Sequence, residues 1–98
     1  MTINRELEGD KLTLKIEGKI DTKTSPELEK TIRESLDGIK ELIFDLEQTS
    51  YFSSAGLRVL LIAQKQMNKQ GTMKAVHVNS DLMEILEITG FLDILTVE

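Results

Sequence analysis

Residues 41–63 read ELIFDLEQTSYFSSAGLRVLLIA, and this stretch contains the two elements on which the fold depends. Its first part, Glu41 to Leu46, has a continuous apolar centre, which is typical of a strand that is buried on both faces of a sheet. Its second part starts a helix that we expect to run from Ser53 to Gln70 and to end at Gly71. The first half of this helix is apolar on nearly every side, so we expect it to be the buried central helix of the domain.

Strands and helices alternate on both sides of this stretch. On the N-terminal side, two runs of period two meet at Gly9-Asp10, which predicts an antiparallel hairpin. A helix follows from Thr24, where Thr24 to Glu27 have the composition of a capping box, and Asp37-Gly38 ends it. On the C-terminal side, we expect a strand over residues 72–78, a helix that starts at residues 79–81 and ends at Gly90, and a strand over residues 94–97.

The predicted order is therefore β-β-α-β-α-β-α-β. Right-handed crossovers make neighbouring strands parallel once strands alternate with helices, whereas the first hairpin supplies an antiparallel pair. A chain of 98 residues has the length of one domain, so we predict a single α/β domain over residues 1–98, with helices packed on a small mixed sheet. On the first helix, Glu29 and Arg33 are expected to face water.

The composition excludes several classes of protein. The chain has no Cys and one His, so disulfide frameworks, thiolate sites and multi-histidine metal sites are absent. Its formal net charge of −5 argues against nucleic-acid binding, which requires a basic surface. The longest apolar run covers residues 59–63, far short of the ~20 residues of a membrane helix. We see no secretory signal and expect a cytoplasmic protein without membrane insertion.

The sequence does not indicate an enzyme. His77 is the only histidine, and the pattern places it in the middle of a strand, on the face that carries Met73 and Ala75. Serine nucleophiles need a histidine and an orienting carboxylate, and the sequence does not place these groups together. Both nucleotide-binding loops, GxxxxGK[ST] and GxGxxG, are missing. We therefore expect no catalytic residue, no cofactor and no metal site.

One segment departs from this ordinary pattern, the serine-rich start of the long helix. Ser53 and Ser54 are consecutive hydroxyl residues where one N-cap is enough, and Ala55 and Gly56 leave the first turn almost bare of side chains. A helix start with exposed amides favours an anion, so a phosphate on Ser54 would be compatible with the fold. The simpler interpretation is that these serines only cap the helix.

Several stretches occur in the order of one known family. They are residues 18–21 (GKID), 25–28 (SPEL), 42–46 (LIFDL), 51–60 (YFSSAGLRVL) and 84–91 (EILEITGF). In these stretches the chain resembles the bacterial anti-sigma factor antagonists, which belong to the STAS domains that are also found in sulphate transporters. The SSAGL stretch is the most specific part of the resemblance.

The resemblance implies a partner-switching protein. The unphosphorylated domain of the family binds an anti-sigma factor that is also a serine kinase, and so frees a sigma factor for transcription. That kinase uses ATP to phosphorylate a serine at the start of the central helix, which breaks the complex, and a PP2C-type serine phosphatase reverses the reaction. The modified serine stands two residues before the Gly-Leu pair, which is Ser54 here. Many members have Asp in the preceding place, where this chain has Ser53, so Ser53 is a second candidate acceptor.

The resemblance also implies a contact surface for the partner. It comprises the loop after the second strand, the helix start and a basic residue on the first helical turn: Asp21, Thr22, Lys23, Ser53, Ser54, Ala55, Gly56 and Arg58. In the family, the Asp of the Gly-x-Ile-Asp turn, here Asp21, lies near the phosphorylation site. Arg58 has an alternative interpretation as an ordinary solvated side chain whose stem covers apolar neighbours.

Two other functions stay open at this point. A STAS subunit that docks on a membrane transporter complex for lipids or anions would use the same helix start for assembly, with Ser54 as a plain cap. A direct nucleotide sensor is the third hypothesis, and the missing phosphate-binding loop disfavours it.

Overall fold

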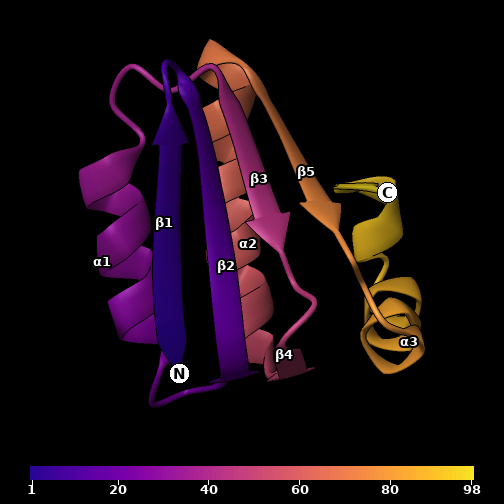
Figure 1. Cartoon of the computed structure of the whole chain (residues 1–98). Helices are drawn as coiled ribbons and strands as arrows, with labels where there is room; N and C mark the ends of the chain where they lie inside the picture. Colours follow the sequence, from indigo (N-terminus) through magenta and orange to yellow (C-terminus); the bar gives the residue numbers. More distant parts are fainter.

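Strand β2 organises the sheet, because it pairs with three other strands (Figure 1). In the computed structural model, which describes all 98 residues, β1 (Thr2–Glu8) runs antiparallel to β2 (Lys11–Ile20). The first half of β2 pairs in parallel with β3 (Glu41–Asp45), and its end pairs in parallel with β4 (Thr49–Phe52). The sheet continues from β3 to β5 (Thr72–Val76) and β6 (Thr96–Val97), which are both parallel to their neighbours.

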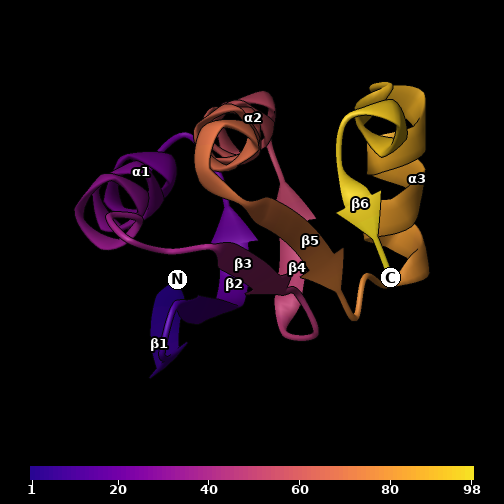
Figure 2. The same cartoon turned by 90° about the horizontal axis from the view of Figure 1, so that it is seen from above.

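Two helices cover one face of this sheet. Helices α1 (Ser25–Ser35) and α2 (Ser54–Gln70) lie next to each other on the same side, as Figure 2 shows along the strands. Helix α3 (Ser80–Ile88) lies at the β6 side of the sheet and contacts β4, and the short 3-10 helix η1 (Phe91–Asp93) leads from it to β6. The domain therefore has a helical layer and a sheet layer, with one apolar core between them.

The core follows the alternation of the strands. Leu14 of β2 lies opposite Phe44 of β3, which in turn lies opposite Ala75 of β5, and all three side chains are buried against the helices. In β3, Ile43 is also buried on the other face, so the prediction of a strand buried on both faces is confirmed. The helices contribute buried residues at helical spacing, among them Leu28 and Ile32 of α1 and Leu57, Leu60, Ala63 and Met67 of α2.

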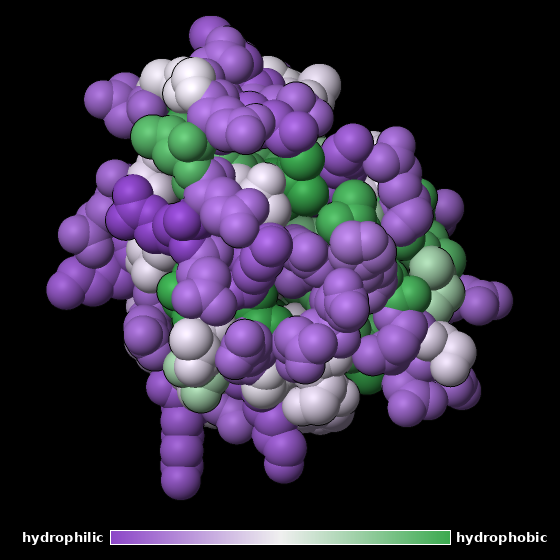
Figure 3. Space-filling view, in the orientation of Figure 1, coloured by the Kyte–Doolittle hydropathy of each residue, from purple (hydrophilic) through white to green (hydrophobic).

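The opposite face of the sheet carries polar side chains and ion pairs. Lys15 Nζ of β2 lies 3.1 Å from Glu6 Oε1 of β1, and Lys74 Nζ of β5 lies 3.0 Å from Glu98 Oε2. Figure 3 views the molecule from this side and shows a mostly hydrophilic surface that is interrupted by separate apolar spots. This half-solvated arrangement explains the period two of β2, whereas β1 is exposed along nearly its whole length, with Leu7 exposed at the edge of the sheet. No helix of the protein has both the length and the apolar character needed to cross a membrane.

The predicted α/β class is confirmed, and several local expectations need correction, among them the strand predicted over residues 72–78, which ends at Val76. The short strand β4 was not predicted, because its two middle residues, Ser50 and Tyr51, are exposed and leave no apolar run. The last strand covers only Thr96–Val97 instead of residues 94–97, since η1 uses the preceding segment. The capping box at the start of α1 is absent, because the Thr24 hydroxyl donates to the Lys19 carbonyl oxygen and does not cap the helix.

Candidate functional site at the start of helix α2

The serine-rich helix start lies beside the end of β2. Strand β4 is parallel to β2, and Ile20 lies opposite Phe52 in their register, so the chain leaves both strands at the same edge. The backbone N–H of Ser53 donates to the Ile20 carbonyl oxygen at 2.9 Å. The loop from Asp21 to Lys23 and the start of α2 are thus held next to each other.

Ser53 and Ser54 have different roles in this geometry. Ser53 is the N-cap of α2, and its hydroxyl oxygen accepts a hydrogen bond from the Gly56 N–H at 3.3 Å. Ser54 is the first residue inside the helix, its side chain is exposed, and its hydroxyl has no protein partner. The interpretation of Ser54 as a plain cap is therefore wrong, because Ser53 already performs that function.

Gly56 allows α2 to approach the end of β2 closely. A Cβ atom at this position would lie 2.6 Å from the Ile20 carbonyl oxygen and 2.7 Å from its Cγ2 atom. Gly56 is buried, whereas Ala55 is half-buried beside it. The small residues at this helix start thus have a structural reason, which is the contact with Ile20.

Asp21 organises the loop before α1. Its Oδ1 atom accepts hydrogen bonds from the backbone N–H groups of Lys23 at 2.9 Å and Thr24 at 3.0 Å. The Thr24 N–H bond is the main reason why the pKa of the Asp21 carboxyl lies below its ordinary value. Thr22 and Lys23 are exposed at the tip of this loop.

An open groove between α1 and α2 begins next to this loop. Thr22, Ala55 and Arg58 line it from the predicted contact surface, and Glu29 and Arg33 line it from α1. Arg58 Nη1 lies 3.2 Å from Glu29 Oε1, and Arg33 Nη2 lies 3.0 Å from Glu29 Oε2. The hydrogen bond from Arg33 is the main reason why the pKa of Glu29 lies below its ordinary value.

Glu29 and Arg33 are two of the groove residues that the sequence analysis did not assign to a site, since it placed both on the solvent face of a helix. Their four-residue spacing signals an ion pair within α1, and the structure contains that pair. Glu29 and Arg58 are 29 residues apart in the chain, so no local sequence pattern could predict their contact.

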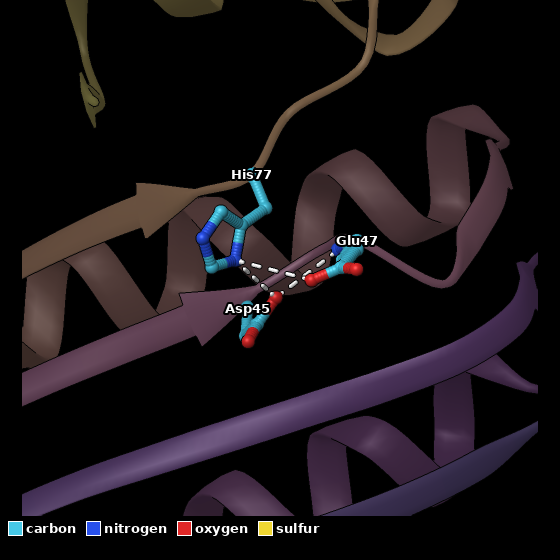
Figure 4. A group of neighbouring side chains, drawn as sticks. All are labelled: Asp45, Glu47 and His77. Carbon is cyan, nitrogen blue, oxygen red and sulfur yellow. Dashed lines mark hydrogen bonds and ion pairs between the residues drawn. The ribbon is translucent and has the colours of Figure 1, made fainter.

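His77 belongs to a second cluster, which it forms with Asp45 and Glu47 (Figure 4). Strand β5 ends at Val76, and His77 follows it in the left-handed region with a φ of 57°, so its predicted position in the middle of a strand is wrong. Its Nδ1 atom lies 3.0 Å from Asp45 Oδ1 and 3.7 Å from Glu47 Oε2. The three ligand atoms lie within 4.8 Å of one another and could hold a cation, but His77 and Glu47 are exposed. The ion pairs of His77 with the two carboxylates are sufficient to explain why these three residues lie together.

We expect the His77 pair to make the stability depend on pH. The hydrogen bond to Asp45 and the charge of that carboxylate raise the pKa of His77 above its ordinary 6.5. The pair therefore stabilises the folded protein below pH 6.5, and this contribution is lost as the pH rises through the raised pKa. Proton NMR should give one imidazole titration with its midpoint above 6.5, and Asp45→Asn should lower that midpoint. A wild-type midpoint at or below 6.5 would contradict the pairing.

These features define a class of protein. It is a small α/β domain in which helix α2, capped by Ser53, exposes the Ser54 hydroxyl without a hydrogen-bond partner. This hydroxyl lies beside the ends of the parallel strands β2 and β4. A model of the STAS domain family matches residues 2–98, and the chain belongs to this family.

Named relatives agree with this assignment. A proposed anti-sigma factor antagonist of Bordetella bronchiseptica, BtrV, is 33% identical over 84 residues, which cover 84% of this chain and 72% of that protein. The anti-sigma-B factor antagonist of Staphylococcus aureus is 30% identical over 86 residues, which cover 86% and 80%. The crystal structure of an anti-sigma factor antagonist from Mycobacterium paratuberculosis superposes with a TM-score of 0.87 at 23% identity and covers 98% of this chain and 83% of that one. The resemblance found in the sequence is thus confirmed.

Proposed function

We propose that this chain is an anti-sigma factor antagonist that works as a phosphorylation-controlled partner switch. In the unphosphorylated form it binds an anti-sigma factor with serine kinase activity and thereby frees a sigma factor. Its membership of the STAS family and its named relatives support the general role. The contact surface is formed by the Asp21–Lys23 loop, the helix start from Ser53 to Gly56, and Arg58.

Phosphorylation of Ser54 ends the complex in this proposal. The Ser54 Oγ atom attacks the γ-phosphorus of the ATP bound to the kinase, so that a Ser–O–P bond forms, the bond to ADP breaks, and a base of the kinase takes the hydroxyl proton. The phosphate adds a charge of roughly −1.5 to −2 at the centre of the contact surface. Desolvating this charge in an interface is costly, so the partner dissociates. A PP2C-type phosphatase restores the hydroxyl group.

The observation that carries this proposal is the difference between the two serines. Ser53 uses its hydroxyl as the helix cap, whereas the Ser54 hydroxyl is exposed and makes no hydrogen bond within the protein. A kinase can reach Ser54 without breaking the cap, and the N-terminal end of the helix tolerates the added negative charge. Ser54 is therefore our proposed acceptor in preference to Ser53.

A pull-down from the source cells tests the proposal. The tagged protein is incubated with ADP or with ATP, and mass spectrometry identifies both the partners and the state of the peptide that contains Ser53 and Ser54. We expect a kinase-type ATPase that is retained with ADP and released with ATP as Ser54 gains a phosphate. Ser54→Ala should retain this partner under both conditions, and Ser53→Ala should release it as the wild-type protein does. Transporter subunits bound to an unmodified protein under both conditions would overturn the proposal and favour a docking subunit.

A further inference from the structure

We propose that Arg58 is the internal partner of the phosphate on Ser54, and that phosphorylation moves its guanidinium group from Glu29 to the phosphate. This inference rests on the proposed function, because it takes Ser54 as the modified residue. It assigns a regulatory role to an ion pair between α1 and α2 that is formed before modification.

The helix geometry places the two side chains on one face. Ser54 and Arg58 are four residues apart in α2, which makes them neighbours on the helix surface. Long side chains in a helix point back towards its N-terminus, so Arg58 extends towards the turn that contains Ser54. Both side chains are exposed, and the small side chain of Ala55 beside them leaves space for a phosphate.

Glu29 can release Arg58 without losing its charge partner. Its Oε1 atom pairs with Arg58, whereas its Oε2 atom accepts hydrogen bonds from Arg33 Nε at 3.1 Å and Nη2 at 3.0 Å. Arg33 stands one helical turn away on α1 and stays in place when Arg58 leaves. The exchange therefore leaves no unpaired carboxylate in the groove.

The exchange is favoured by charge. Glu29 offers Arg58 one carboxylate charge that it already shares with Arg33, whereas a phosphoserine offers roughly −1.5 to −2 and three acceptor oxygens. A guanidinium group binds a phosphate through two parallel N–H donors, which its single contact with Glu29 Oε1 does not provide. The phosphate is thus the stronger of the two partners for Arg58.

The movement of Arg58 would change the groove between α1 and α2 as well as the start of α2. The Arg58–Glu29 contact is the only ion pair between α1 and α2, and both residues line the groove that separates these helices. Moving Arg58 to the phosphate removes a positive charge from the groove and leaves the pair of Glu29 and Arg33 there. A partner that binds in the groove would therefore change its affinity on phosphorylation even if it does not contact Ser54.

The test measures the phosphate itself. Phosphoserine is incorporated at position 54 during translation, which requires no kinase, and phosphorus NMR follows its second ionisation in the wild-type background, in Arg58→Gln and in Lys65→Gln. The second pKa of phosphoserine is about 6, and a nearby guanidinium lowers it. We expect the pKa to be lower by about half a unit to one unit in the wild-type background than in Arg58→Gln, since the helix dipole is the same in both. This difference should shrink in high salt.

Lys65→Gln is the matched control. Lys65 is an exposed residue of the same helix, it makes no ion pair, and it lies two turns beyond Arg58, so the substitution removes the same charge at a greater distance from Ser54. Its phosphate pKa should equal that of the wild-type background. Equal phosphate pKa values in the wild-type background and in Arg58→Gln would overturn the inference.

The same samples separate this inference from the proposed function. If the phosphorylated protein no longer binds the anti-sigma factor kinase but Arg58→Gln leaves the phosphate pKa unchanged, the switch stands and the role of Arg58 falls. If Arg58 lowers the phosphate pKa but phosphorylation does not weaken binding of the kinase, the ion-pair exchange stands and the proposed function falls.

Discussion

Ser54→Asp is expected to keep the fold and to bind the proposed partner, an anti-sigma factor with kinase activity, at least about tenfold more weakly than the wild-type protein, which corresponds to a loss of about 1.4 kcal/mol or more in binding free energy. The side chain at position 54 is exposed and lies in the first turn of α2, where a carboxylate interacts favourably with the helix dipole. The loss therefore arises in the complex, where the added charge must be desolvated. To shift the partner from about 99% bound to about 99% free, the binding free energy must change by about 5.5 kcal/mol. One carboxylate has less negative charge than a phosphate, so it gives only part of this change.

Isothermal titration calorimetry with the recovered kinase measures this effect, and the chain provides its own control. Ser53→Asp introduces the same charge one residue earlier, at the N-cap, where Asp is as good a cap as Ser. We expect Ser53→Asp to lose clearly less affinity than Ser54→Asp, because its carboxylate is engaged in capping the helix, and we expect Ser54→Ala to bind as tightly as the wild-type protein and to stay bound in ATP. Tight binding by a folded Ser54→Asp protein, or an equal loss in Ser53→Asp, would show that charge at position 54 does not control the complex.

Local periodicity was sufficient to predict most of the fold. The continuous run in β3 predicted burial on both faces, and Leu42, Ile43 and Phe44 are all buried. The change from period two to helical spacing located α1, α2 and α3, because each of these helices buries one face against the sheet or its neighbours. The serine-rich start of α2 was found for a related reason, since capping residues mark helix ends in the sequence.

Contacts between distant residues could not be predicted in this way. His77 meets Asp45 because parallel pairing of β3 and β5 brings both strand ends to the same edge of the sheet, although 32 residues separate them. Arg58 meets Glu29 because α1 and α2 lie together on one face, and this packing depends on the whole core. The sequence also could not show that Ser53 caps the helix while Ser54 does not. Both positions carry serine, which is a good cap, and only the actual helix boundary distinguishes them.

Gly71→Ala is expected to have the largest effect on stability, a loss of about 3 kcal/mol in the free energy of unfolding. A Cβ atom at this position would lie 1.9 Å from the Lys40 carbonyl oxygen and 2.6 Å from its carbonyl carbon. The obstacle is backbone, so it cannot rotate away as a side chain would. The same carbonyl oxygen accepts the Thr72 N–H at 2.9 Å, and Thr72 is the first residue of β5 in its register with β3. Relieving the clash therefore pulls β5 away from the start of β3.

Urea denaturation followed by circular dichroism measures this loss, and a thermal scan should show a melting temperature that is lower by roughly 10 to 20 °C. Gly9→Asn is the control, since Gly9 has a φ of 60° but nothing within 4 Å of a built Cβ atom, and Asn tolerates this conformation. We expect this control to change the free energy of unfolding by less than about 1 kcal/mol. The pair separates two reasons for glycine, because Gly71 has an extended φ of −179° and is needed for space, whereas Gly9 is needed for its backbone angle. If Gly71→Ala were no less stable than Gly9→Asn, the close approach of residue 71 to Lys40 would not be a requirement of the fold.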